Sequence, residues 1–268
     1  MRPTGKTALV TGATGGLGQV IAHTFTARGV RPVLTGRNSD TLTRLADELD
    51  CPAITADITA DGDFAALMQQ AGPIDILVAN AGISGPVSLA DATLEEIDAF
   101  VAVNLRAPMR MARIAAEQMA RQGGGHIVFM SSLGGRIPLP RMSLYCSTKH
   151  GLRGFAHAIR ADLASHGIGV SVICPTFVRD AGMVTRQPVP LPPWAPTCTA
   201  QQVADAVYRA IVTNTAEILV APWYLRQITR LSGLSPAIPA GINRLTRLDR
   251  HAEAITDGLA RRQTSHIL

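Results

Sequence analysis

Lysine and aromatic residues are scarce in this chain of 268 residues, and long hydrophobic runs are missing from it. Aromatic side chains make up 4% of the sequence, and no helix-turn-helix or zinc-finger spacing occurs, so we expect no nucleic-acid binding despite a formal net charge of +5. The apolar runs are only as long as strands, and the first residues lack a signal-peptide pattern. We therefore expect neither a transmembrane helix nor an export signal.

The cysteines do not form a recognisable site either. The four cysteines contain no C-x-x-C pair, so a zinc site or a thioredoxin-type site has no support. Cys146 and His150 are four residues apart, but no further ligand lies near them in the sequence, so we predict no metal site. A chain without an export signal is expected in the reducing cytoplasm.

Nearly all of the positive charge excess lies in the last 46 residues. Residues 223–268 hold seven arginines against three acidic residues, and leucines and isoleucines alternate with the first four arginines. We interpret 1–222 as one domain and 223–268 as a basic, amphipathic, helical extension. The extension has two interpretations: it packs on its own protein or a neighbouring subunit, or it makes peripheral contact with an anionic membrane.

Strand and helix patterns alternate along the rest of the chain. The sequence predicts strands at 7–11, 32–35, 53–56, 74–78, 126–130, 168–174 and 218–220. It predicts helices at 18–28, 41–49, from 93 onward, at 108–121, at 145–166 and from 199 onward. This alternation is typical of the α/β class, with a doubly wound parallel sheet (Rossmann-type) of about seven strands and helices on both faces. Ligands in such sheets bind beyond the carboxyl ends of the strands.

A glycine-rich turn follows the first predicted strand and opens a helix. It reads Thr11-Gly-Ala-Thr-Gly-Gly-Leu-Gly18, a T-G-x-x-x-G-x-G spacing. Glycines let the backbone turn tightly and approach a pyrophosphate, and a helix N-terminus offers N–H groups and positive partial charge. The alternative is a turn that binds no ligand.

The second predicted strand ends in Thr35-Gly-Arg37-Asn38. NAD enzymes place Asp or Glu near this point to bind the ribose hydroxyls, whereas the guanidinium of Arg37 can pair with a 2′-phosphate. The sequence therefore favours NADP(H) over NAD(H); the alternative is a surface arginine in a turn.

Tyr145 and Lys149 are four residues apart on a predicted helix and therefore share a face. An ammonium close to a phenol favours the phenolate, so we expect Lys149 to lower the pKa of Tyr145 and make it a general acid/base. Ser132 follows the strand at 126–130, where its hydroxyl can donate to a carbonyl oxygen.

These residues together resemble the short-chain dehydrogenase/reductase family, over about residues 6–222. Further matches are Asn80-Ala-Gly82 after the fourth strand, Asp57 after the third, and Asn104 within a helix. The resemblance implies four catalytic residues: Asn104, Ser132, Tyr145 and Lys149. The cofactor contacts drawn from the turn, the arginine and the resemblance together are Gly12, Thr14, Gly16, Leu17, Gly18, Arg37, Asn38, Asp57, Ile58, Asn80, Gly82, Tyr145, Lys149, Pro175 and Val178.

The resemblance also implies a role for each catalytic residue. Tyr145 exchanges a proton with the substrate oxygen, Ser132 polarises the carbonyl, Lys149 binds the nicotinamide ribose, and Asn104 holds a relay water. The chain departs from the family's P-G-x-V-x-T pattern after the sixth strand, where Thr176 replaces glycine and Asp180 replaces threonine. These departures put the nicotinamide contacts in doubt.

We conclude from the sequence that the chain is an NADP(H)-dependent oxidoreductase that interconverts a carbonyl and a secondary alcohol, with reduction of a hydrophobic small-molecule substrate favoured. The alternatives are a non-catalytic dinucleotide-binding sensor or scaffold and an NAD-dependent alcohol or steroid dehydrogenase. The proline-rich stretch 188–196 is interpreted as a substrate lid or a rigid linker. The resemblance implies a homodimer or homotetramer through the helices near 108–121 and 145–166.

Overall fold

The computed structural model describes residues 1–60, 63–85, 87–181, 195–232 and 241. The main sheet consists of β1 (Thr7–Thr11), β2 (Arg31–Gly36), β3 (Ala53–Thr55), β4 (Ile76–Ala79), β5 (Gly125–Met130), β6 (Ile168–Pro175) and β9 (Glu217–Val220). A separate pair of short strands consists of β7 (Phe177–Val178) and β8 (Thr197–Cys198).

The helices alternate with these strands along the chain. They are α1 (Gly16–Ala27), α2 (Ser39–Leu49), α3 (Asp63–Ala71), α4 (Leu94–Val101), the π-helical turn η1 (Ala102–Arg106), α5 (Ala107–Arg121), the 3₁₀ turn η2 (Leu133–Gly135), α6 (Ser143–Ala164), α7 (Ala200–Thr213) and α8 (Trp223–Ser232). Every pairing in the sheet is parallel, in the order β3-β2-β1-β4-β5-β6-β9. The predicted Rossmann-type class is therefore confirmed.

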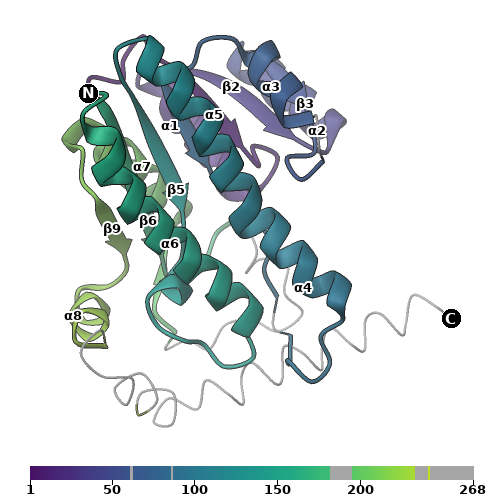
Figure 1. Ribbon diagram of the computed structural model, residues 1–268, viewed down its shortest axis with the longest axis vertical. Coiled ribbons are helices and arrows are strands. Elements are labelled where there is room, and N and C mark those ends of the chain that lie inside the picture. Colours follow the sequence, from purple (N-terminus) through teal and green to yellow (C-terminus); the bar gives the residue numbers. More distant parts are fainter. Residues whose placement is uncertain (61–62, 86, 182–194, 233–240, 242–268) are drawn as a thin grey trace, which may run out of the picture.

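Two hydrophobic layers hold the helices against the sheet. One layer packs α1, α2 and α7 on one face, and the other packs α3, α5 and α6 on the opposite face. Figure 1 shows α5 and α6 side by side across the near face, with α1 and α7 behind the sheet. Successive strand residues alternate between the layers, as period-2 strands buried on both faces require: Val10 belongs to the first layer and Leu9 to the second.

Local sequence signals set several helix ends. Thr93 and Glu96 form the predicted capping box of α4, and Thr199 and Gln202 form the corresponding box of α7. The chain order reverses direction between β1 and β4, which are neighbours in the sheet. A ligand site is expected at this switch point.

Other features differ from the sequence prediction. The helix α3 was not predicted, because its three core side chains, Phe64, Leu67 and Met68, span little more than one turn. The helix predicted from 93 runs through a π-helical turn into α5, and the strand predicted at 74–78 is observed at Ile76–Ala79.

The C-terminal extension is described only in its first part. In α8, Leu225 and Thr229 are buried, so this helix packs on the rest of the protein, whereas Trp223 is 75% exposed. No helix among the described residues is both long and apolar enough to cross a membrane. Most of the tail and of the stretch 188–196 lies outside the described residues. The domain boundary at 222 stays a prediction.

A buried polar chain links β5, β6 and the residues before β9. Ser171 donates a hydrogen bond to the Thr215 carbonyl (2.7 Å) and lies 2.9 Å from Nε2 of His126, so its hydroxyl oxygen accepts from that nitrogen. His126 is 1% exposed, and this burial lowers its pKa to about 3.

This burial makes the stability of the fold depend on pH. The unfolded state binds a proton at His126 near pH 6.5 and the folded state does not, so its contribution is complete above pH 6.5 and is lost as pH falls toward 3. We expect a loss of about 2 kcal/mol between pH 7 and pH 5, measured by urea unfolding. His126→Gln should flatten this dependence and the exposed His166→Gln should not; equal slopes in both variants would contradict the prediction.

Candidate active site

A cavity of about 570 Å³ opens at the carboxyl ends of the strands. It runs from the turn after β1, past the ends of β2, β3 and β4, to the ends of β5 and β6 and the start of α6. Of the predicted site residues, all except Asn104 line it: Gly12, Thr14, Gly16, Leu17, Gly18, Arg37, Asn38, Asp57, Ile58, Asn80, Gly82, Ser132, Tyr145, Lys149, Pro175 and Val178.

The glycine-rich turn is packed backbone against backbone. Gly12 has φ +64°, and a Cβ on it would lie 2.9 Å from the Cα of Ala81. A Cβ on Gly18 would lie 2.2 Å from the Gly12 carbonyl oxygen. Gly15 caps α1 without a side-chain hydrogen bond, so the first N–H groups of α1 are available to an anion.

Thr11 and Asn80 fasten this turn to the end of β4. Oγ1 of Thr11 accepts the backbone N–H groups of Asn80 and Ala81, each at 3.1 Å. In return, Nδ2 of Asn80 donates to the Thr11 carbonyl at 3.0 Å. Asn80 therefore shapes the turn through its side chain, whatever contact its backbone makes with a ligand.

The end of β2 carries positive charge and no acidic residue. Arg37 is exposed at the cavity, and Asn38 accepts the Thr41 N–H (2.8 Å) to cap α2. Asp57 accepts both the hydroxyl and the N–H of Thr59, and these bonds, with a smaller effect of Arg37, lower the pKa of its carboxyl group. The carboxylate of Asp57 is therefore charged and oriented at neutral pH.

The Ser-Tyr-Lys group meets at the opposite end of the cavity. Ser132 accepts the Gly134 N–H (3.1 Å) and hydrogen-bonds to Tyr145. Lys149 is 3% exposed; its Nζ donates to the Met130 carbonyl at 2.9 Å and lies 5.7 Å from the centroid of the Tyr145 ring.

The expected lowering of the Tyr145 pKa by Lys149 is not found in this geometry. Burial raises the pKa of Tyr145 to about 12, although the hydrogen bond with Ser132 opposes this rise. Burial also lowers the pKa of Lys149 to about 8. Loss of water around the phenol is the largest effect on the pKa of Tyr145, which therefore holds its proton at neutral pH.

Asn104 lies behind the cavity wall, in the π-helical turn η1. Its carboxamide accepts the Ile83 N–H and donates to the Ile83 carbonyl, both at 2.9 Å, and also donates to Thr148 at 3.3 Å. Thr148 in turn donates to the Tyr145 carbonyl (2.8 Å). Asn104 therefore joins the segment after β4 to the first turn of α6, and its implied role as holder of a water stays a prediction.

The two departures after β6 have structural partners. Thr176 donates to the Pro196 carbonyl (2.9 Å), and Asp180 accepts the Ala200 N–H (2.8 Å) at the start of α7. Between them, Phe177 and Val178 of β7 pair with β8. These two hydrogen bonds thus hold β7 and β8 together, one before the paired residues and one after them.

Comparison with known proteins agrees with this geometry. The family model for the short chain dehydrogenase matches residues 6–188. The chain belongs to the short-chain dehydrogenase family. Within it, the chain is 35% identical over 226 residues to the "Ketoacyl reductase HetN" of Nostoc sp., covering 81% of this chain and 79% of that protein. It is 34% identical over 202 residues to "Oxidoreductase UcpA" of Escherichia coli, covering 71% and 76%.

A solved structure confirms the likeness in three dimensions. A "short chain dehydrogenase/reductase family protein" superposes with a TM-score of 0.73 at 27% identity, covering 82% of this chain and 97% of that one. The family model and these relatives together establish that this short-chain dehydrogenase is an NAD(P)-dependent oxidoreductase of the carbonyl and alcohol type.

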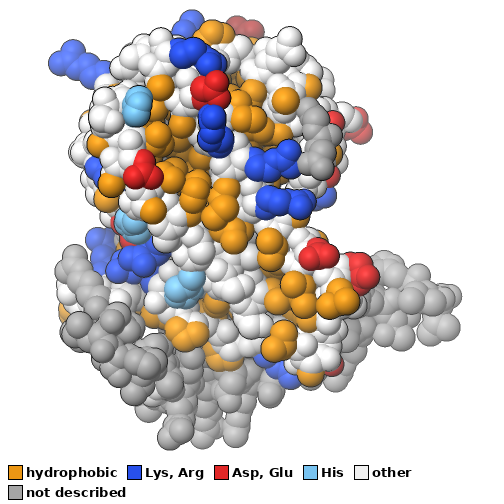
Figure 2. All heavy atoms as spheres, viewed as in Figure 1, with side chains coloured by type: hydrophobic (Ala, Val, Ile, Leu, Met, Phe, Trp, Pro, Cys, Tyr) orange, Lys and Arg blue, Asp and Glu red, His pale blue; other side chains and the backbone are white. Residues whose placement is uncertain are grey.

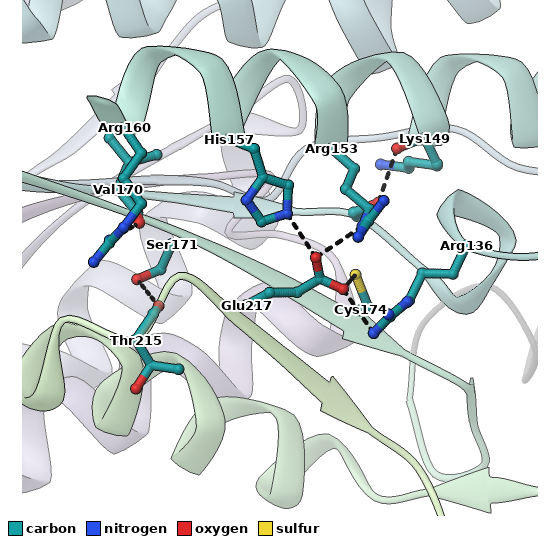
Figure 3. A network of polar contacts seen from close by, with 11 residues as sticks. Arg136, Lys149, Arg153, His157, Arg160, Val170, Ser171, Cys174, Thr215 and Glu217 are labelled. Atoms are coloured by element: carbon teal, nitrogen blue, oxygen red, sulfur yellow. Dashed lines mark hydrogen bonds and ion pairs between the residues drawn. The ribbon is translucent and has the colours of Figure 1, made fainter. Parts of the chain in front are cut away.

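An ion cluster next to the Ser-Tyr-Lys group was not predicted. Figure 3 shows the carboxylate of Glu217, on β9, between Arg136 after η2 and two side chains of α6, Arg153 and His157. The distances from Glu217 oxygens are 2.8 Å to Arg136, 2.7 Å to Arg153 and 2.6 Å to His157. Burial favours a higher pKa for Glu217, but the His157 hydrogen bond and the two arginine charges together lower it.

This cluster connects the two parts of the active site that carry Tyr145 and Ser132, namely α6 and the loop after β5. Tyr145, Lys149, Arg153 and His157 follow one another at steps of four on α6, so they form a single stripe. Glu217 holds the far end of this stripe and, through Arg136, the loop that follows Ser132. The four-residue spacing of basic side chains after Lys149 was the available sequence signal. Their acidic partner, Glu217, lies 60 residues beyond His157 on β9 and gave no signal.

Replacing Gly18 with alanine tests the tightness of the glycine-rich turn. The new Cβ would overlap the Gly12 carbonyl, so we expect Gly18→Ala to destabilise the fold by about 1–3 kcal/mol and to weaken cofactor binding at least tenfold. Gly154→Ala is the matched control, because a Cβ on this α6 residue meets nothing within 4 Å and should stabilise the helix by about 0.5–1 kcal/mol. Thermal unfolding and fluorescence titration measure both; an unchanged Gly18→Ala protein would refute the close packing.

Proposed function

We propose that this short-chain dehydrogenase reduces the carbonyl group of a hydrophobic, ketoacyl-type substrate with NADPH. One observation carries the proposal: Ser132, Tyr145 and Lys149 line the same cavity as the glycine-rich turn. The name of the ketoacyl reductase relative suggests the substrate class. Apolar side chains near the Ser-Tyr-Lys group offer a surface for such a substrate: Ile83, Leu133, Leu139, Met142, Phe177 and Val178.

The chain's residues fit a nicotinamide dinucleotide with a 2′-phosphate. The uncapped start of α1 suits a pyrophosphate, and Arg37, in the absence of an acidic residue at the end of β2, suits the 2′-phosphate. The backbone N–H of Arg179, directly after β7, donates to the carbonyl of Cys198, which is paired with Val178. In a parallel pair with this pattern, the backbone groups of Val178 itself point away from β8. Those groups are suited to the nicotinamide carboxamide. When bound, this cofactor supplies the hydride.

The protein's own residues handle the proton and the carbonyl oxygen. Ser132 donates a hydrogen bond that polarises the carbonyl, and Tyr145 transfers its proton to the carbonyl oxygen. A phenol with a pKa of about 12 holds that proton at neutral pH, which is the form that reduction needs. Lys149, with a pKa near 8, is mostly charged at neutral pH and stabilises the phenolate as it forms.

The partner predictions remain open. Figure 2 shows hydrophobic side chains gathered over α5 and α6, the face that the resemblance assigns to self-association. Ile114 and Phe155 are among the partly buried residues of these helices. The homodimer or homotetramer stays a prediction that light scattering would measure, and contact of the tail with membranes also stays a prediction.

Removing the phenolic hydroxyl tests the proton donor. We expect Tyr145→Phe to lower kcat at least about 100-fold, because the proton then has no donor at the carbonyl oxygen, while NADPH binding stays within about twofold. Tyr208→Phe, on α7, is the control and should keep full activity. NADPH oxidation with a 3-ketoacyl thioester measures kcat. Near-normal turnover by Tyr145→Phe would refute the mechanism.

Reversing the charge at Arg37 tests the cofactor preference. The wild-type protein should bind NADPH more tightly than NADH, and Arg37→Asp should weaken NADPH binding by about 10- to 100-fold, because the 2′-phosphate loses a charge-assisted hydrogen bond. Arg44→Asp, an exposed change on α2, should leave the ratio of the two affinities unchanged. Fluorescence titration gives both constants; a wild-type preference for NADH would show that Arg37 is a surface residue with no part in cofactor selection.

A further inference from the structure

A second cavity, of about 360 Å³, lies beside the active site. One face of α7 forms a wall, with Gln202, Asp205, Ala206 and Arg209. The rest of the described lining comes from β8, the end of β9, the residue after β7 and the start of α8. Among the described residues, none lines both cavities. The β7–β8 pair adjoins both, because Phe177 and Val178 face the active site and Thr197 and Cys198 line the second cavity.

Three arginines from three different segments line this second cavity. Arg179 follows β7, Arg209 lies on α7, and Arg226 lies on α8. Asp205 is the one acidic residue among the described lining residues. Its Oδ1 is already 2.5 Å from the guanidinium of Arg28 and accepts a hydrogen bond from Gln201 (3.1 Å). The three guanidinium charges in the lining therefore have no acidic partner there that is not already paired.

The guanidinium groups are partly pre-organised. Nη1 of Arg179 donates to the Thr197 hydroxyl at 2.9 Å, and Nε of Arg226 donates to the Ala221 carbonyl at 2.8 Å. Each contact uses one of the five guanidinium N–H groups and fixes the side chain, and the remaining donors are left for a ligand. Within the described part of the chain, the guanidinium of Arg209 makes no hydrogen bond or ion pair. A ligand that accepts several hydrogen bonds would satisfy all three.

We propose that this cavity is a phosphate-binding site, separate from the cofactor site. A phosphate monoester carries about −1.5 to −2 charge and three acceptor oxygens, which matches several guanidinium groups better than a carboxylate does. The 2′-phosphate of the cofactor is not its ligand. Arg37 stands at the end of β2, whereas this cavity stands at β9, the opposite edge of the sheet. The site binds either a soluble phosphorylated compound or a phospholipid headgroup.

Two exposed aromatic side chains next to the cavity bear on the question whether the phosphate belongs to a lipid headgroup. Trp223 is 75% exposed and Tyr224 is 43% exposed, and both directly follow Pro222, which lines the cavity. The two rings lie edge to face, with centroids 6.3 Å apart. Exposed Trp and Tyr are favoured at a membrane surface, where the ring is apolar and its polar end stays wet.

The test uses the full chain with a saturating nicotinamide cofactor, so that added phosphate cannot fill the glycine-rich turn or reach Arg37. Inorganic phosphate is titrated by calorimetry at constant ionic strength, with chloride as the comparison anion. We expect saturable phosphate binding that weakens at least tenfold in Arg209→Gln, whose side chain has no structural contact to lose. Arg44→Gln, which removes an exposed charge on α2, is the matched control and should bind like wild type.

A second arm separates the two sources of the phosphate. The same proteins are sedimented with vesicles of phosphatidylcholine, with and without phosphatidic acid. Sedimentation that requires phosphatidic acid and is lost in Arg209→Gln identifies a lipid headgroup, whereas phosphate binding without sedimentation identifies a soluble ligand. The proposal is overturned if neither probe binds, or if Arg209→Gln binds both probes as tightly as wild type does.

Discussion

The close approach of two backbones at the switch point of the sheet determines the geometry of the site. The turn after β1 comes so near to the end of β4 that Gly12 has no space for a side chain, and the turn folds so tightly on the start of α1 that Gly18 has none either. Thr11 and Asn80 lock this approach with reciprocal hydrogen bonds. Because α1 starts directly from this turn, its first N–H groups point into the cavity, and the cavity can reach from β2 to β6 without an obstacle. A side chain at Gly12 would push the turn away from the end of β4, and one at Gly18 would push the start of α1 away from the turn.

The proposed proton chemistry depends on the burial of two side chains of α6, Tyr145 and Lys149. Burial acts on Tyr145 and Lys149 in opposite directions, since it raises the pKa of the phenol and lowers that of the ammonium. The phenol is consequently the weaker acid of the two. In the proposed mechanism, the phenol stays protonated until negative charge develops on the carbonyl oxygen of the substrate, and Lys149 stabilises the phenolate that results. The Glu217 cluster keeps α6 and the Ser132 loop in register while this occurs, through Arg153 and Arg136.

Sequence periodicity was sufficient for the parts of the site that lie at strand ends or along one helix. The carboxyl ends of parallel strands meet at one edge, so residues such as Arg37 and Ser132 could be placed together without knowing a single contact. The Tyr145–Lys149 pair on α6 followed in the same way from a four-residue spacing, whereas Arg153 and His157 were not predicted. The relation of Glu217 to Arg136 could not be predicted, because it joins an edge strand to a loop 81 residues earlier. Asn104 was placed in the right helix but not behind the cavity wall, since a π-helical turn shifts the face that a side chain presents.

The direction of the pKa shift of Tyr145 could not be predicted from spacing. An i, i+4 pair states that an ammonium is near a phenol, but the sign of the shift depends on the solvent around both, which spacing does not contain. The same reasoning separates Lys149 from the arginines of the proposed sites. Arginine stays charged at any physiological pH and binds anions in a fixed plane, which suits Arg37, Arg179 and Arg209. A buried ammonium can instead have its pKa moved toward neutrality, and in the proposed mechanism this property of Lys149 serves the proton transfer. At Arg37 and Lys149, the choice between the two cations thus follows the chemistry of the proposed site and not its charge alone.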